Sequence, residues 1–379
     1  MKLEQRRWTR STGWKTTKTR DDLGVPQLVL FFADSGVMRE GKPILELRAL
    51  YPDAQILGCS TAGEICGTEV TDDTVVATAI QFEHSTVRTA YEVIDDPSHS
   101  AEAGRRLAQS IPHDGLVHAI VLAEGLHVNG SDLAEGLRGA FPPSVAVTGG
   151  LAGDGAAFKE TAVHLNGQSH KGGIALVGLY GERLKVGYGS LGGWDSFGPE
   201  RVVTRSAGNI LYELDGGSAL DLYKEYLGEH AAGLPASGLL FPLSLQGESG
   251  EPGIVRTILG VDEDAGSVVF AGDIPEGRRA RLMKANIDRL IDGAHGAADA
   301  SYEAVGSQTP DLAILISCVG RRLVFKGRVE EEPESVQEVL GAGTSMSGFY
   351  SYGEIAPFAK SVKCELHNQT MTITTISER

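Results

Sequence analysis

The chain has 379 residues, 41% of them apolar and 22% charged, which is enough apolar sequence to bury more than one core. Its formal net charge of −16 argues against nucleic acid or an anionic membrane surface as the main partner, and it favours a small molecule or a protein. No apolar run approaches the roughly 18 residues that cross a bilayer, and the four cysteines form no C-x-x-C pair. We therefore expect a soluble, cytoplasmic protein with neither a zinc site nor a disulfide framework.

The N-terminal segment differs from the rest of the chain in charge. Its first twenty residues carry seven Lys or Arg against one acidic residue. The segment lacks the apolar stretch of a secretory signal. We expect residues 1–23 to form a basic tail that is exposed or lies at a sheet edge.

Two stretches of the first half align without a gap. They are "YPDAQILGCSTAGE" at 51–64 and "FPPSVAVTGGLAGD" at 141–154. An apolar run comes before each, "LVLFF" at 28 and "AIVLA" at 119, with a helical stretch between the run and the loop. The pattern predicts a β-α-β unit, ending in a small-residue loop, that is used twice.

A third copy follows "AILIS" at 313 and ends in "GFYSYGEI" at 348–355, which matches "GCSTAGEI" at 58–65. A degraded fourth copy extends from residue 202 to Gly247 and Glu248. The copies predict an α/β protein with mixed sheets, built as two related β-α-β-containing halves by internal duplication. We expect an N domain over 24–221 and a C domain over 222–379.

Seven motifs in this order resemble the FIST family, the F-box and intracellular signal transduction proteins. They are "GCSTAGEI", "GGLAGD", "RSAGNILYELDGGSALDLYKEYLG", "FAGDIPEG", "SCVGRR", "GFYSYGEIAP" and "CELHNQTMTITTI". The resemblance implies a FIST N domain followed by a FIST C domain, in a sensory protein that binds a small ligand. It further implies a separate signalling partner, such as a histidine kinase or a cyclic-di-nucleotide signalling protein. Some members of the family are haem proteins that sense nitric oxide, so haem is a possible cofactor.

The candidate binding residues lie in loops that follow predicted strands. A strand that ends in a glycine-rich loop leaves backbone N–H groups unpaired, and such groups bind carboxylates or phosphates. The predicted ligand-binding residues are Ser60, Thr61, Gly63, Glu64, Gly149, Gly150, Gly153, Asp154, Arg321, Tyr350, Ser351, Tyr352 and Glu354. Alternatively, the glycines only turn tight corners, the acids cap nearby amides, the tyrosines belong to the core, and Arg321 pairs with the acidic residues at 330–334.

No catalytic motif supports an enzyme. "GCSTAG" and "GFYSYG" both depart from the G-x-S-x-G nucleophile elbow, and the phosphate-loop and H-E-x-x-H patterns are missing. Our leading hypothesis is therefore a non-enzymatic sensor. Three alternatives stay open. One is an enzyme on a small polar metabolite that uses Glu64, Asp154 or Glu354 as general acid or base, and another is a pure interaction scaffold. The third is a haem sensor, which needs an axial ligand in an apolar pocket. His164 and His367 lie at near-equivalent turns, but a histidine beside a turn more often forms hydrogen bonds at the surface.

Overall fold

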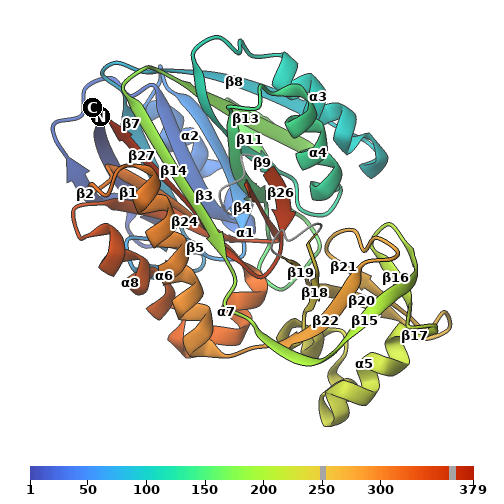
Figure 1. Ribbon diagram of the computed structural model, residues 1–379. Coiled ribbons are helices and arrows are strands. Elements are labelled where there is room, and N and C mark those ends of the chain that lie inside the picture. Colours follow the sequence, from blue (N-terminus) through green and yellow to red (C-terminus); the bar gives the residue numbers. More distant parts are fainter. Residues whose placement is uncertain (248–252, 358–363) are drawn as a thin grey trace.

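A computed structural model describes residues 1–247, 253–357 and 364–379 (Figure 1). Three mixed sheets and their helices form an α/β body, and a fourth sheet, whose strands lie between residues 195 and 284, lies beside it. The predicted α/β class with mixed sheets is confirmed. In the described part of the chain, no helix is both long enough and apolar enough to span a membrane.

Three β-α-β units, each with its two strands paired in parallel, organise the body. The first unit contains β3 (Leu28–Asp34), α1 (Ser35–Glu40), α2 (Lys42–Leu50) and β4 (Gln55–Thr61). The second contains β9 (Leu116–Ala123), α4 (Gly130–Ala140) and β10 (Ala146–Leu151). The third contains β23 (Leu312–Cys318), α7 (Val319–Phe325), α8 (Glu331–Leu340) and β24 (Ser345–Ser351). Both halves of the chain thus contain β-α-β units, as predicted, with two in the first half and one in the second.

The apolar runs found in the sequence are the first strands of these units. They are buried along nearly their whole length, as is typical of parallel strands that are covered on both faces. A parallel pair needs a crossover connection, and a helix provides it in each unit.

After each unit the chain leaves its own sheet and adds a strand to another. From the first unit, β5 (Glu64–Cys66) pairs with β24 of the third. From the second, β11 (Val163–Leu165) pairs with β4 of the first. From the third, β25 (Gly353–Pro357) pairs with β10 of the second. The three sheets are therefore linked in a closed cycle by exchanged strands.

The other elements of the body complete the three sheets and cover them. They are β1 (Lys2–Thr9), β2 (Gly13–Arg20), β6 (Glu69–Thr71), β7 (Val75–Gln81), β8 (Thr86–Val93), η1 (Pro97–His99), α3 (Ser100–Gln109), β12 (Gln168–Ser169), β13 (Gly173–Tyr180), β14 (Leu184–Leu191), α6 (Ile287–Ala304), η5 (Lys326–Arg328), β26 (Cys364–His367) and β27 (Met371–Glu378). The strand order is β12-β11-β4-β3-β7-β1-β2 in the first sheet, β26-β25-β10-β9-β13-β8 in the second and β14-β27-β23-β24-β5-β6 in the third. Residues 2–20, within the segment expected as a basic tail, form the β1–β2 hairpin, and β2 is the edge strand of the first sheet.

The three sheets share one apolar core. Phe32 of the first unit, Leu122 of the second and Ile316 of the third belong to the same buried cluster. The rings of Phe32 and Phe349 stack in it with their centroids 4.8 Å apart. Because this core joins all three units, none of them buries its apolar face alone.

The fourth sheet is antiparallel throughout its described strands. Its elements are β15 (Asp195–Ala207), β16 (Ile210–Leu214), β17 (Gly217–Ser218), α5 (Ala219–Leu227), η2 (Gly228–Gly233), η3 (Ala236–Leu240), β18 (Leu243–Leu245), β19 (Ile254–Arg256), β20 (Ile258–Asp262), β21 (Ser267–Phe270) and β22 (Arg279–Lys284). The strand order is β19-β18-β22-β15-β16-β21-β20, with β17 paired to β16. Val203, Tyr223 and Phe270 belong to a separate core beneath this sheet.

The sequence suggested a fourth β-α-β copy in this region, and the structure differs. The described strands from 202 to 247 do not pair in parallel, and β16 and β18 are not neighbours. The turn after β16 contains Asp215 and Gly216, both with positive φ, and such residues favour a hairpin over a crossover. Glu248, the expected end of this copy, lies outside the described residues.

Candidate functional site

The strand-end loops of the three units meet in the centre of the body. Ala62 N donates to Tyr350 O at 2.8 Å, and Tyr350 N donates to Gly63 O at 2.9 Å. Gly153 N donates to Ser60 O at 3.0 Å, which adds the second loop. The predicted loops therefore lie together, in a ring of backbone hydrogen bonds.

The predicted glycines permit this close approach. A Cβ on Gly63 would lie 2.6 Å from Arg322 Nη1, and one on Gly149 would lie 1.8 Å from Val121 O. A Cβ on Gly150 would lie 2.8 Å from Ile316 Cγ2, and one on Gly153 would lie 3.0 Å from Ala62 N. All four positions face other parts of the protein, so their backbone packs in the interior and faces no cavity.

Two buried carboxyl groups repeat the same arrangement in the first and third units. Glu64 accepts from the hydroxyls of Thr61 and Thr74, the latter at 2.7 Å. Glu354 accepts from the hydroxyl of Ser351 at 2.6 Å and from that of Thr370 at 2.9 Å. Burial raises the pKa of both carboxyls to about 8, so both are mostly protonated at neutral pH.

The second unit departs from this arrangement. In the other two units, one hydroxyl residue ends the second strand and the other stands just before a later strand. The residues at these two positions of the second unit are Leu151, at the end of β10, and Gly172, just before β13. Neither can donate a side-chain hydrogen bond to Asp154, the counterpart of Glu64 and Glu354. The carboxylate of Asp154 instead accepts from three backbone N–H groups of the loop that follows it, at 2.8 to 2.9 Å.

Asp154 organises an aromatic pair through these contacts. The Tyr352 hydroxyl donates to its carboxylate, and the ring of Phe158 stacks on Tyr352 at 4.5 Å between centroids. Burial raises the pKa of Asp154, but the hydrogen bonds from Tyr352 and the backbone outweigh it and hold the pKa below its ordinary value. Phe158 has a φ of +51°, which is rare for a bulky residue.

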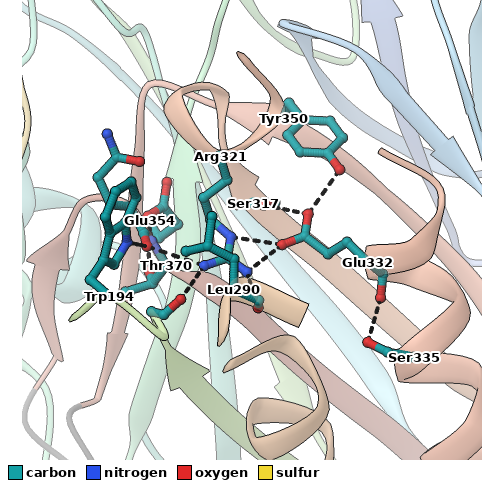
Figure 2. Close-up of polar contacts among 11 residues, drawn as sticks. Trp194, Leu290, Ser317, Arg321, Glu332, Ser335, Tyr350, Glu354 and Thr370 are labelled. Carbon is teal, nitrogen blue, oxygen red and sulfur yellow. Dashed lines mark hydrogen bonds and ion pairs between the residues drawn. The ribbon is translucent and has the colours of Figure 1, made fainter. Parts of the chain in front are cut away.

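Arg321 lies at the centre of a second buried network (Figure 2). Its guanidinium pairs with Glu332, with Nε 2.7 Å from Oε1, and both side chains are fully buried. The other carboxylate oxygen of Glu332 accepts from Ser317 at 2.9 Å and from the Tyr350 hydroxyl at 2.8 Å. Arg321 thus pairs within the acidic segment 330–334, as the alternative interpretation expected, but in the interior of the protein.

The same guanidinium holds both connections to the fourth sheet. It donates to Gly192 O, just before β15, and to Leu290 O at 2.8 Å, shortly after β22. Trp194 Nε1 donates to Gln369 O at 2.8 Å beside it. Arg321 therefore fixes the two chain segments that connect the fourth sheet to the body.

A cavity of about 310 Å³ opens between the second unit and the fourth sheet. Tyr352, Phe158, Leu151 and the loop from Gly125 to Gly130 line one side, and Asn209 and the segment from Phe270 to Asp273 line the other. It lies outside the carboxyl ends of the parallel strands β9 and β10, where α/β sheets usually bind ligands. This cleft between the body and the fourth sheet is the candidate site.

Few of the predicted residues reach the cleft. Tyr352 lines it, and the Tyr352 hydroxyl donates a hydrogen bond to the Asp154 carboxylate. The others contribute to the buried loop ring and to the Arg321 network, namely Ser60, Thr61, Gly63, Glu64, Gly149, Gly150, Gly153, Arg321, Tyr350, Ser351 and Glu354.

Sequence reasoning missed the loop "EGLHVNG" at 124–130. Its conformation depends on Glu124, whose carboxylate accepts from His127 N at 2.7 Å and His127 Nδ1 at 3.0 Å. Asn129 then caps α4 by accepting from Ser131 N at 3.0 Å and Asp132 N at 3.2 Å. The available signal was its position after the apolar run at 119–123, since a loop at that end of a parallel strand is a usual ligand site.

The two histidines considered as haem ligands both use Nε2 within the protein. The Nε2 of His164 accepts from Gly167 N at 3.0 Å, and the Nε2 of His367 donates to Ala356 O at 3.0 Å. Because that nitrogen is engaged in each ring, neither histidine offers it to a haem iron.

Metal binding and a reactive thiol are two further kinds of site to consider. The described residues contain no group of three or more His, Cys, Asp or Glu side chains that could hold a metal ion. Burial raises the pKa of the Cys59 thiol well above its ordinary value, so Cys59 is a poor nucleophile.

Comparison with known proteins identifies two family domains. The FIST N domain matches residues 27–217, and the FIST C domain matches residues 219–357. No curated protein matches the sequence. Among solved structures, a cyanuric acid hydrolase from A. caulinodans has a TM-score of 0.37 and 8% sequence identity, over 93% of this chain and 90% of that chain. A likeness at this level says nothing about function.

We expect the free energy of unfolding of the double variant Glu64→Gln, Glu354→Gln to depend less on pH than that of the wild type. In the wild type the folded pKa of about 8 exceeds the ordinary value of 4.5. The protonated carboxyl therefore stabilises the fold fully below pH 4.5. Between pH 4.5 and the folded pKa of about 8, each carboxyl lowers the free energy of unfolding by about 1.4 kcal/mol per pH unit, and its contribution is lost once the pH passes 8. Urea unfolding from pH 5 to pH 8 measures this slope. Glu338→Gln, at an exposed position of α8, is the control, and a double variant with the wild-type slope would contradict the assignment.

We expect Arg321→Met to lower the free energy of unfolding by about 3–5 kcal/mol, because it leaves the Glu332 carboxylate buried without its partner. Adding Glu332→Leu removes that charge and should restore part of the loss. Urea unfolding of both single variants and the double variant gives the coupling energy. Purely additive losses would show that the pair does not act as a unit.

Proposed function

Because the chain belongs to the FIST family, with a FIST N domain followed by a FIST C domain, we propose that it is a ligand-binding sensory protein of intracellular signal transduction. FIST domains are associated with sensing in signal transduction. A small molecule binds in the cleft between the body and the fourth sheet, and a separate signalling partner responds to its occupancy. The partner classes are those implied by the family resemblance, a histidine kinase or a cyclic-di-nucleotide signalling protein.

The position of the cleft carries this proposal. One wall belongs to the body, from the second β-α-β unit, the loop after it and Tyr352, and the other belongs to the fourth sheet. A ligand that contacts both walls binds one relative arrangement of the two parts better than another, and such differential affinity is what a switch requires. Pockets of this size at domain interfaces are also common small-molecule sites.

The contacts of the three candidate carboxyl groups favour binding over catalysis. Glu64 and Glu354 are buried away from the cleft and engage hydroxyl partners. Asp154 is engaged by Tyr352 and by three backbone amides. We therefore propose a non-enzymatic role.

A cytoplasmic location completes the proposal. All four cysteines are free thiols in the interior of the protein. Free cysteines are usual in a reducing compartment.

Filling the cleft tests the proposal. Ala271 lies in its wall, and Ala271→Phe should abolish retention of a small molecule that the wild type captures from a cell extract. Ala304→Phe, on the exposed end of α6, is the matched control and should retain the same molecule. Mass spectrometry of the compounds released on denaturation measures retention. If Ala271→Phe retains the same compounds in the same amounts, the cleft is not the binding site.

A further inference from the structure

The ionisable residues of the cleft suggest the charge of its ligand. Asp273 and His127 are the titratable residues of its lining besides Tyr352. Among the described residues, no hydrogen bond or ion pair reaches the Asp273 carboxylate oxygens. Asp132 in the first turn of α4 lies close by, and burial together with the charges of Asp273 and Glu135 raises its pKa. Asp273 and Asp132 therefore place negative charge at this wall, and the Asp273 carboxylate also interacts with the buried guanidinium of Arg256.

The nearest arginine does not offer an anion site. Arg256 is buried beneath Gly272, where an added Cβ would lie 2.9 Å from Arg256 Nε. Its guanidinium donates to the backbone oxygens of Asp273 at 3.2 Å and Leu366 at 2.9 Å. The first amides of α4 are likewise engaged, by the Asn129 side chain. An anion in the cleft would find few free donors.

The aromatic pair gives the cleft a second feature that suits a cation. Phe158 and Tyr352 stack nearly in parallel, with 16° between their planes. Phe158 is 40% exposed, although a side chain of this size usually avoids both exposure and positive φ. Asp154 holds it there by accepting from Phe158 N at 2.8 Å. Aromatic faces attract ammonium groups by 0.5 to about 2 kcal/mol.

We propose that the cleft binds a small organic cation, an amine with an apolar body, with its ammonium group between the Asp273 carboxylate and the Phe158–Tyr352 pair. The apolar body contacts Leu151 and Phe270, which line the same cavity. This inference rests on the proposed function, since it names the ligand class of the same site.

Matched probes of different charge test the ligand class on the full chain. One set is phenethylamine, 2-phenylethanol and 3-phenylpropionate, and a second is tryptamine, tryptophol and indole-3-propionate. Isothermal titration at low salt should show an amine binding about tenfold more tightly than its alcohol, with the carboxylate weakest. Asp273→Asn should lower amine affinity about tenfold and leave alcohol affinity unchanged, while Asp264→Asn in an exposed turn should change neither.

The outcomes separate this inference from the proposed function. Equal affinity across a set, or tightest binding of a carboxylate, overturns the cation class, as does failure of both amines to bind. If the amines still bind Asp273→Asn, Phe158→Ala and Ala271→Phe, they bind outside the cleft, and this result also overturns the inference. In each case the extract experiment with Ala271→Phe decides independently whether the cleft is a ligand site at all.

Discussion

The exchange of strands among three sheets is the constraint on which the rest of the structure depends. Each β-α-β unit is followed by a strand that pairs with a different unit. The connecting loops must therefore pass through the centre of the body, where they bond to one another. This is why these loops are rich in glycine and why most of their side chains are buried, with the hydroxyl groups of Thr61 and Ser351 bonded to internal carboxyls.

The second unit is where this symmetry is broken and where the cleft opens. Leu151 replaces a hydroxyl residue, so Asp154 is available to shape the loop that carries Phe158. The fourth sheet supplies the opposite wall, and buried Arg321 fixes the two connections to that sheet. The cleft and the Arg321 network thus both contact the fourth sheet or its connections, the cleft through Phe270–Asp273 and Arg321 through the two connecting segments.

The sequence could predict the repeated units, because apolar runs followed by glycine loops have a strong local signal. It also named Tyr352 and Asp154 as candidates, although not their contact. The sequence could not predict the exchange of strands, because strands that pair across a long stretch of chain leave no periodic pattern. The cleft was missed because Asp273 and Phe158 come together only through packing between separate domains. Arg321 was predicted to bind a ligand, whereas the structure buries it in a pair with Glu332. A buried arginine and an exposed one look alike in sequence.

Hydrogen exchange with and without the small-molecule fraction of a cell extract tests the central claim most directly, because it locates binding without assuming a ligand. The account predicts slower exchange in the loop from Gly125 to Gly130, around Phe158 and in the segment from Phe270 to Asp273, which line the cleft. Slower exchange confined to any other region, or no change anywhere, would contradict it.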